Sequence, residues 1–246
     1  MSNRQDTSLL AMRFSRLGTT GLPVSAVSTG AWTACDPVSI DVQFQYDNGT
    51  DVVQKDGAGR LCFVRKRPDN LKHATVKFDL CGGDPRGLEL ILSGPGVIIG
   101  GTTTPSGFGI QVANCTDKPR NGIFVEWFTE NYLCNSVDTN DPNSRHFLPK
   151  VIANYDGGKW DEAKHQFTFT GICNAGVVQA LTQTGMTGSV SASVATAGGP
   201  FNDISGFPTD QAFLYGYTTN SGEANILNAL VCSGQLGAGY IATPTQ

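Results

Sequence analysis

Residues Leu71–Gly94, with the sequence LKHATVKFDLCGGDPRGLELILSG, contain two hydrophobic periods in succession. In the first half, apolar and polar residues alternate without a break. Alternation with a period of two is typical of a β-strand that buries one face. The apolar face of this predicted strand carries Ala74, Val76, Phe78 and Leu80, and the polar face carries His73, Thr75, Lys77 and Asp79.

The second half of the stretch changes to the period of a helix. Asp84 suits the N-cap, Pro85 suits the first helical position, and Gly94 suits the residue after the last turn. The apolar side is formed by Leu88, Ile91 and Leu92. A helix of about residues 85–93 is too short to be stable alone, so it must pack on a β core. We therefore expect a mainly β fold, a β-sandwich or barrel of antiparallel strands with one short flanking α-helix.

The composition supports one large β domain. The chain has 246 residues, 30 glycines, 12 prolines and only 15% charged residues, which disfavours a helical protein. A chain of this length buries enough surface to form a core without disulfides or a metal. The formal net charge of −4 gives no reason to expect tight nucleic-acid binding, which needs a concentrated basic surface.

The seven cysteines are an odd number, and no two have C-x-x-C spacing. Several fall inside strand patterns, so we interpret them as buried free thiols in a reducing compartment rather than a disulfide framework. The segment Met1–Asp6 is polar and unlike a signal peptide, and no apolar run approaches the length of a membrane span. We expect the protein to be made and folded in the cytoplasm, without membrane association.

The chain divides into three predicted parts. Residues 1–30 are interpreted as an N-terminal arm that packs only when a partner receives it. Residues 31–231 form the predicted β-sandwich domain, with a Ser/Thr/Gly-rich insertion at 182–199, and residues 232–246 form a Gly-rich tail.

A long segment at residues 47–59 separates two predicted strands, 39–46 and 60–67. Thirteen residues is long for a hairpin loop, and loops of that length are usually functional or disordered. Together with the strand that begins at Leu71, these strands predict an antiparallel meander.

The strand predicted at residues 121–133 is apolar on both faces. Ile123, Val125 and Trp127 alternate with Phe124 and Phe128, so the strand is either central in the sheet or covered by a partner chain. Its aromatic residues could stack on a sugar or a base, although packing is the commoner use of such a cluster. The basic run Arg65–Arg67 is interpreted as a solvated strand end or half of a subunit seam, in preference to a phosphate contact.

The chain lacks the usual catalytic motifs. It has no G-x-S-x-G elbow, no P-loop and no H-E-x-x-H sequence, and its three histidines are spread along the chain. No nucleophile–base pair or metal-ligand set can be assembled, so we predict no catalytic residues, no cofactor and no metal, and a protein that is not an enzyme.

Three segments, in this order, resemble the major tail tube proteins of long-tailed, siphovirus-type phages of actinobacterial hosts. The first is Phe78–Pro85 with the Leu-rich helix behind it, the second is Val125–Thr129, and the third is Arg145–Val151. The resemblance extends from about Trp32 to Ala175. It implies a virion protein of the phage tail, assembled into stacked hexameric rings around a tape-measure protein. Its other implied partners are tail terminator and baseplate proteins, with DNA passing through the tube without specific binding.

Two hypotheses follow for the surfaces of such a subunit. Segment 47–59, by its length and polarity, and the N-terminal arm are expected to make ring-to-ring contacts. The polar faces of the clearest strands suggest the wall of the channel, which we expect to be neutral to acidic. The candidates for inter-ring contact are Asp47, Asn48, Gly49, Thr50, Asp51, Val52, Val53, Gln54, Lys55 and Asp56. The candidates for the intersubunit seam are Phe124, Glu126, Phe128, Arg65 and Arg67, and those for the lumen are Asp41, Gln43, Gln45 and Asp79.

Two alternatives remain open. The chain could be a capsid decoration protein or another virion β-sandwich, which would form trimers or monomers rather than tubes. A carbohydrate-binding module is a weaker alternative, because it would need Trp127 exposed to solvent.

Overall fold

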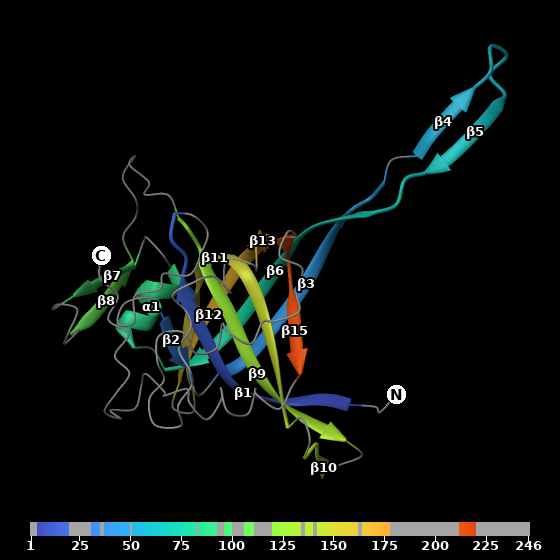
Figure 1. Ribbon diagram of the computed structural model, residues 1–246. Coiled ribbons are helices and arrows are strands. Elements are labelled where there is room, and N and C mark those ends of the chain that lie inside the picture. The colour runs from blue at the N-terminus through green and yellow to red at the C-terminus, as the bar shows by residue number, and fades with distance from the viewer. Residues whose placement is uncertain are drawn as a thin grey trace.

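The computed structural model describes residues 4–19, 31–34, 37–49, 51–82, 84–92, 96–99, 106–110, 120–133, 136–139, 142–161, 164–177 and 212–219. These residues form a mainly β fold with one helix (Figure 1). The strands are β1 (Arg4–Arg16), β2 (Ala31–Ala34), β3 (Pro37–Asp47), β4 (Asp51–Lys55), β5 (Leu61–Lys66), β6 (Asn70–Cys81), β7 (Gly96–Ile99), β8 (Gly107–Ile110), β9 (Ile123–Leu133), β10 (Ser136–Val137), β11 (Asn143–Asp161), β12 (Lys164–Asn174), β13 (Gly176–Val177), β14 (Ala212–Phe213) and β15 (Gly216–Thr219), and the helix is α1 (Pro85–Leu92).

The main sheet is antiparallel and has nine strands. Its order is β2-β1-β9-β11-β12-β6-β3, with β10 paired to β9 and β15 paired to β11. The two ends of this order, β2 and β3, do not pair, so the sheet is not a closed barrel. The expected mainly β, antiparallel fold with one helix is confirmed, in a form consistent with a sandwich.

The strand predicted from the alternating stretch is β6, and its apolar face forms the centre of the core. Val76, Phe78 and Leu80 are at most 1% exposed. The ring of Phe78 stacks on Phe169 of β12 with centroids 5.2 Å apart, and it contacts Phe14 of β1 at the same centroid distance. Because β1 and β6 are not neighbours in the sheet, this contact shows that the two halves of the sheet pack face to face.

Helix α1 forms where the sequence predicts it. The backbone N–H of Arg86 donates to Asp84 Oδ1 at 2.9 Å, so Asp84 caps the helix as expected. The helix buries Leu88, Leu90, Ile91 and Leu92. It approaches β2 so closely that a Cβ at Gly87 would lie 2.3 Å from the indole of Trp32, which excludes any larger residue there without rearrangement.

The N-terminal arm predicted at residues 1–30 is wrong over much of its length. Residues Arg4–Arg16 form β1, which lies inside the main sheet between β2 and β9. Met12 and Phe14 are fully buried, while Arg13 and Arg16 are paired with Glu126 and Glu89. Each of these two charges is therefore matched by a carboxylate from an element distant in the sequence.

The cysteine interpretation is partly corrected. Cys62, Cys81 and Cys173 are free thiols, but only Cys173 is buried, whereas Cys62 and Cys81 are exposed. Burial raises the pKa of the Cys173 thiol to about 12. The insertion predicted at 182–199 and the tail predicted at 232–246 lie outside the described residues.

The packing of Phe78 gives a test of the fold. We expect Phe78→Ala to lower the free energy of unfolding by about 3–5 kcal/mol, because it removes a ring packed between both halves of the sheet. Tyr46→Ala, at a side chain that is 59% exposed, should cost less than about 1 kcal/mol. Urea unfolding followed by circular dichroism measures both, and equal losses would contradict this description of the core.

Candidate interaction surfaces

The inter-ring candidates lie in a projecting β-hairpin, so segment 47–59 is not a loop. Beyond the main sheet, the chain from β3 continues into β4, which pairs with β5 before the chain returns through β6. Figure 1 shows this hairpin extending well away from the body of the sheet. The predicted meander is also wrong, because β3 pairs directly with β6, and β4 and β5 form the outer part of the same long hairpin.

The tip of the hairpin is held by Asp56. Its Oδ1 accepts backbone N–H groups from Ala58 at 2.9 Å and Arg60 at 2.7 Å, and its own N–H donates to the carbonyl of Arg60. Gly59 has a φ of +80°, the left-handed conformation that glycine adopts at low cost. The tip is therefore a hydrogen-bonded turn with the residues that its geometry requires.

The base of the hairpin is narrow. A Cβ at Gly49 would lie 1.9 Å from the carbonyl oxygen of Arg67, so the two strands approach closely there and only glycine fits. The Gly49 N–H donates to Asp69 Oδ1 at 2.9 Å, and Asp47 pairs with Lys72 at 3.4 Å. Of the other inter-ring candidates, Asn48 lies beside this base, Thr50 is outside the described residues, and Asp51–Lys55 form β4.

The hairpin carries exposed apolar side chains. Four of them, all 39–55% exposed, are Val52, Val53, Phe63 and Val64. Isolated two-stranded hairpins are marginally stable in water, and contiguous exposed apolar surface of this kind typically marks an interaction site. Within the described residues, these four side chains remain exposed to solvent.

The four lumen candidates lie on one face of the main sheet. In the register of β3 with β6, Asp41 is opposite Lys77, Gln43 is opposite Thr75, and Gln45 is opposite His73. Asp79 follows on the same side of β6, opposite Ser39. This face is the reverse of the one that carries Phe78, so the structure brings the four candidates together on a polar surface. Their role in a lumen stays a prediction.

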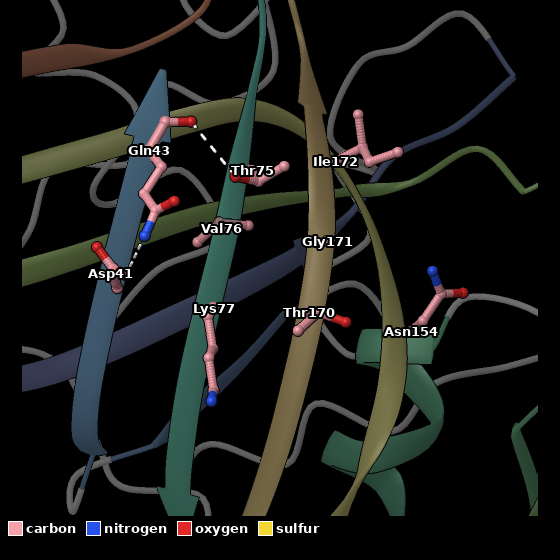
Figure 2. Close-up of a pocket in the computed structure, with 9 residues that line it drawn as sticks. All are labelled: Asp41, Gln43, Thr75, Val76, Lys77, Asn154, Thr170, Gly171 and Ile172. Atoms are coloured by element: carbon pink, nitrogen blue, oxygen red, sulfur yellow. Dashed lines mark hydrogen bonds between the residues drawn. The ribbon is translucent and has the colours of Figure 1, made fainter. Parts of the chain in front are cut away.

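Part of the polar surface is hollowed. Figure 2 shows Asp41, Gln43, Lys77, Thr170 and Asn154 on neighbouring strands around a depression of about 470 Å³. Val76, the buried Gly171 and the exposed Ile172 also line it, so the depression has both polar and apolar walls. One acidic and one basic side chain line this depression, so its local charge is balanced.

Asp79 is held in place by hydrogen bonds from the two neighbouring strands. Its carboxylate accepts hydrogen bonds from Thr168 Oγ1 at 2.6 Å and Ser39 Oγ at 2.8 Å. Burial alone raises the pKa of Asp79, but hydrogen bonds from Thr168, Ser39 and Gln166, with the charge of Lys77, outweigh it, and the pKa lies below its usual value. Asp79 therefore stays ionised at neutral pH.

The intersubunit seam predicted on β9 is wrong. Phe124, Glu126 and Phe128 are fully buried within a single chain. β9 lies between β1 and β11 in the sheet. It is therefore a central strand, which was one of the two interpretations of its two apolar faces; the other was cover by a partner chain. Phe124 stacks on Phe147 of β11 with centroids 5.8 Å apart. The remaining seam candidates, Arg65 and Arg67, belong to the hairpin arm and its base, so the structure does not bring the five residues together.

Glu126 is held between two arginines. Arg145 Nη2 donates to Glu126 Oε2 at 3.0 Å from the next strand, and Arg13 Nη1 lies 3.7 Å from Glu126 Oε1 on the other side. All three side chains are at most 5% exposed. Removing one partner of such a set leaves an uncompensated buried charge. Neither arginine was among the predicted residues. The sequence offered one signal for Arg13: in an alternating strand it shares a face with Ala11 and Ser15.

Trp127 is also buried, with 6% of its surface exposed. It stacks on His146 with centroids 5.3 Å apart and an interplanar angle of 9°. His146 in turn lies 2.6 Å from the hydroxyl of Tyr215 and 3.1 Å from that of Thr129. Trp127 is thus engaged in packing, and the exposed platform that a carbohydrate-binding module needs is not provided by this residue.

Within the described ranges, no group of three or more His, Cys, Asp or Glu residues is arranged to hold a metal ion. No helix among these residues is long and apolar enough to cross a membrane. Comparison with protein-family models gives no match, and comparison with curated proteins gives none either.

The buried ion pairs give a second test. We expect Glu126→Gln to lower the free energy of unfolding by about 3–5 kcal/mol, because two buried guanidinium groups lose their counter-charge. Glu130→Gln on the same strand, at a partly exposed position, is the matched control and should change stability by no more than about 0.5 kcal/mol. Thermal or urea unfolding of both variants measures the difference. Similar small effects would contradict a buried pairing.

Proposed function

We propose that this chain is the subunit of a phage tail tube, which assembles with copies of itself into stacked rings. The observation that carries the proposal is the β4–β5 hairpin, an ordered projection with apolar side chains that its own chain does not cover. A hydrogen-bonded tip and a narrow base hold it in one shape before any partner binds. A preformed arm of this kind favours assembly because little conformational entropy is lost on contact.

The polar surface of β3, β6, β12 and β11 supports the second part of the proposal, a channel for DNA. In this proposal the surface that carries Asp41, Gln43, Gln45 and Asp79 faces the lumen. Phosphates bind strongly to concentrated Lys and Arg, and a wall of balanced polar groups gives them no such site. DNA can then pass without being retained.

The contact between neighbours in a ring is proposed at the free edge of β3. Among the described strands, β3 pairs on one side only, with β6, and its open edge carries unpaired backbone groups. Phe44 and Tyr46, on this strand, are 40% and 59% exposed. A permanent ring contact would be expected to bury ~1,600 Å² or more in total.

The first test is electron microscopy of the concentrated protein, with a hairpin deletion as its partner. We expect the wild type to form rings or hollow tubes. Replacing residues 50–67 by an Asn-Gly turn should leave a folded subunit that forms no tubes, since β3 and β6 still pair and the turn suits a two-residue hairpin. Trimers of the wild type would favour a capsid decoration protein instead, and normal tubes from the deletion would refute ring-to-ring contact by the hairpin.

The second test places a label on the polar surface. In assembled tubes, a cysteine introduced by Gln43→Cys should react with a small biotin–maleimide but should not bind streptavidin, which is too large to reach a label inside the lumen. The exposed Cys62 and Cys81 are changed to serine in the Gln43→Cys protein to reduce background labelling. The same protein before assembly is the control, and it should bind streptavidin. Full streptavidin binding by intact tubes would place this surface outside.

A further inference from the structure

Both faces of the β4–β5 hairpin are apolar at their centre. Val53 of β4 pairs directly with Val64 of β5, so their side chains share one face. On the opposite face, Val52 and Phe63 are diagonal neighbours, because Val52 is opposite Arg65 and Gln54 is opposite Phe63. All four apolar side chains are 39–55% exposed.

A ribbon that lies flat on one partner needs only one apolar face, since its other face stays in water and is normally polar. Here each face presents a pair of large apolar side chains at the same level of the ribbon. Burying a side chain of this size is favourable by roughly 1.5–3 kcal/mol, so leaving either pair in water is costly. The pattern fits a ribbon that is covered on both sides.

The positive charge of the hairpin favours another copy of this chain as its partner. Residues 51–67, the hairpin with its base, contain five of the 17 Lys and Arg residues of the chain and two of its 21 Asp and Glu residues. This segment therefore has a net charge of +3, while the rest of the chain has −7. A basic arm on an acidic body is complementary to another copy of that body, and such complementarity also speeds association. Exposed valine and phenylalanine on both faces favour a protein over a nucleic acid.

The hairpin of a single copy extends away from the body of its own sheet (Figure 1), and among the described residues nothing covers the four apolar side chains. We infer that the hairpin of one copy is clamped between two further copies of this chain. One copy covers the Val53–Val64 face, and the other covers the Val52–Phe63 face. This inference rests on the proposed function only in taking the chain itself as the partner. It implies that each hairpin joins three subunits, so a ring-to-ring contact also reinforces the contact between neighbours.

Two paired variants test the inference, one for each face. Val53→Thr with Val64→Thr alters the first face, and Val52→Thr with Phe63→Thr alters the second. Threonine keeps the preference for a strand, so the hairpin should remain folded while its hydroxyls oppose burial. Val137→Thr, on β10 and outside the hairpin, is the control.

The measurement is the critical concentration for association, by sedimentation velocity, with electron microscopy of the products. We expect each paired variant to raise that concentration about tenfold or more and the control to leave it unchanged. An effect of one face alone would overturn the clamp in favour of a ribbon lying flat. No effect of either face would overturn the hairpin as an interface.

Two further outcomes separate this inference from the proposed function. Dependence on both faces in closed, non-tubular oligomers would support the clamp and contradict the tail tube. A wild type that stays monomeric to the highest concentration, or that binds duplex DNA through Arg65 and Lys66 without associating, would overturn both.

Discussion

The structure depends on the pairing of β3 with β6. This pairing places the alternating side chains of both strands on two distinct surfaces, with Phe78 in the core and Asp79 on the polar side. The same pair of chain segments then continues outward as β4 and β5. One long hairpin thus supplies part of the core, the polar surface and the projecting arm, so the geometry of all three is coupled.

The second half of the sheet completes the core at a cost. β1 and β9 bring Phe14 onto Phe78, but they also bury Glu126 between Arg13 and Arg145. Buried ion pairs rarely add net stability, because desolvation offsets most of their attraction. Their effect here is to specify the register, since a shift of β1 by one residue would move Arg13 into the apolar core and leave Glu126 with one partner fewer.

The sequence was sufficient for the elements whose signal is local. Alternation identified β6, and Asp84 and Pro85 identified the start of α1. Long-range pairing was not predictable: β1 pairs with β9, more than 100 residues further along the chain, and Arg13 is neutralised by Glu126 of that strand. The two apolar faces of β9 fitted a central strand and a seam equally well. In the hairpin, DVVQK is too short to show a period, and the turn at Asp56 that aligns it with β5 becomes visible only in the fold.

The central claim is that the hairpin is exposed in the free subunit and covered on both faces in the assembly. Hydrogen exchange of the backbone amides, measured by mass spectrometry below and above the concentration at which the protein associates, tests this directly. Residues 51–66 should exchange faster than residues 74–80 in the free subunit and become strongly protected on association, while the pairing of β3 with β6 keeps residues 74–80 protected in both states. Rapid exchange of residues 51–66 in the assembled protein would contradict the account.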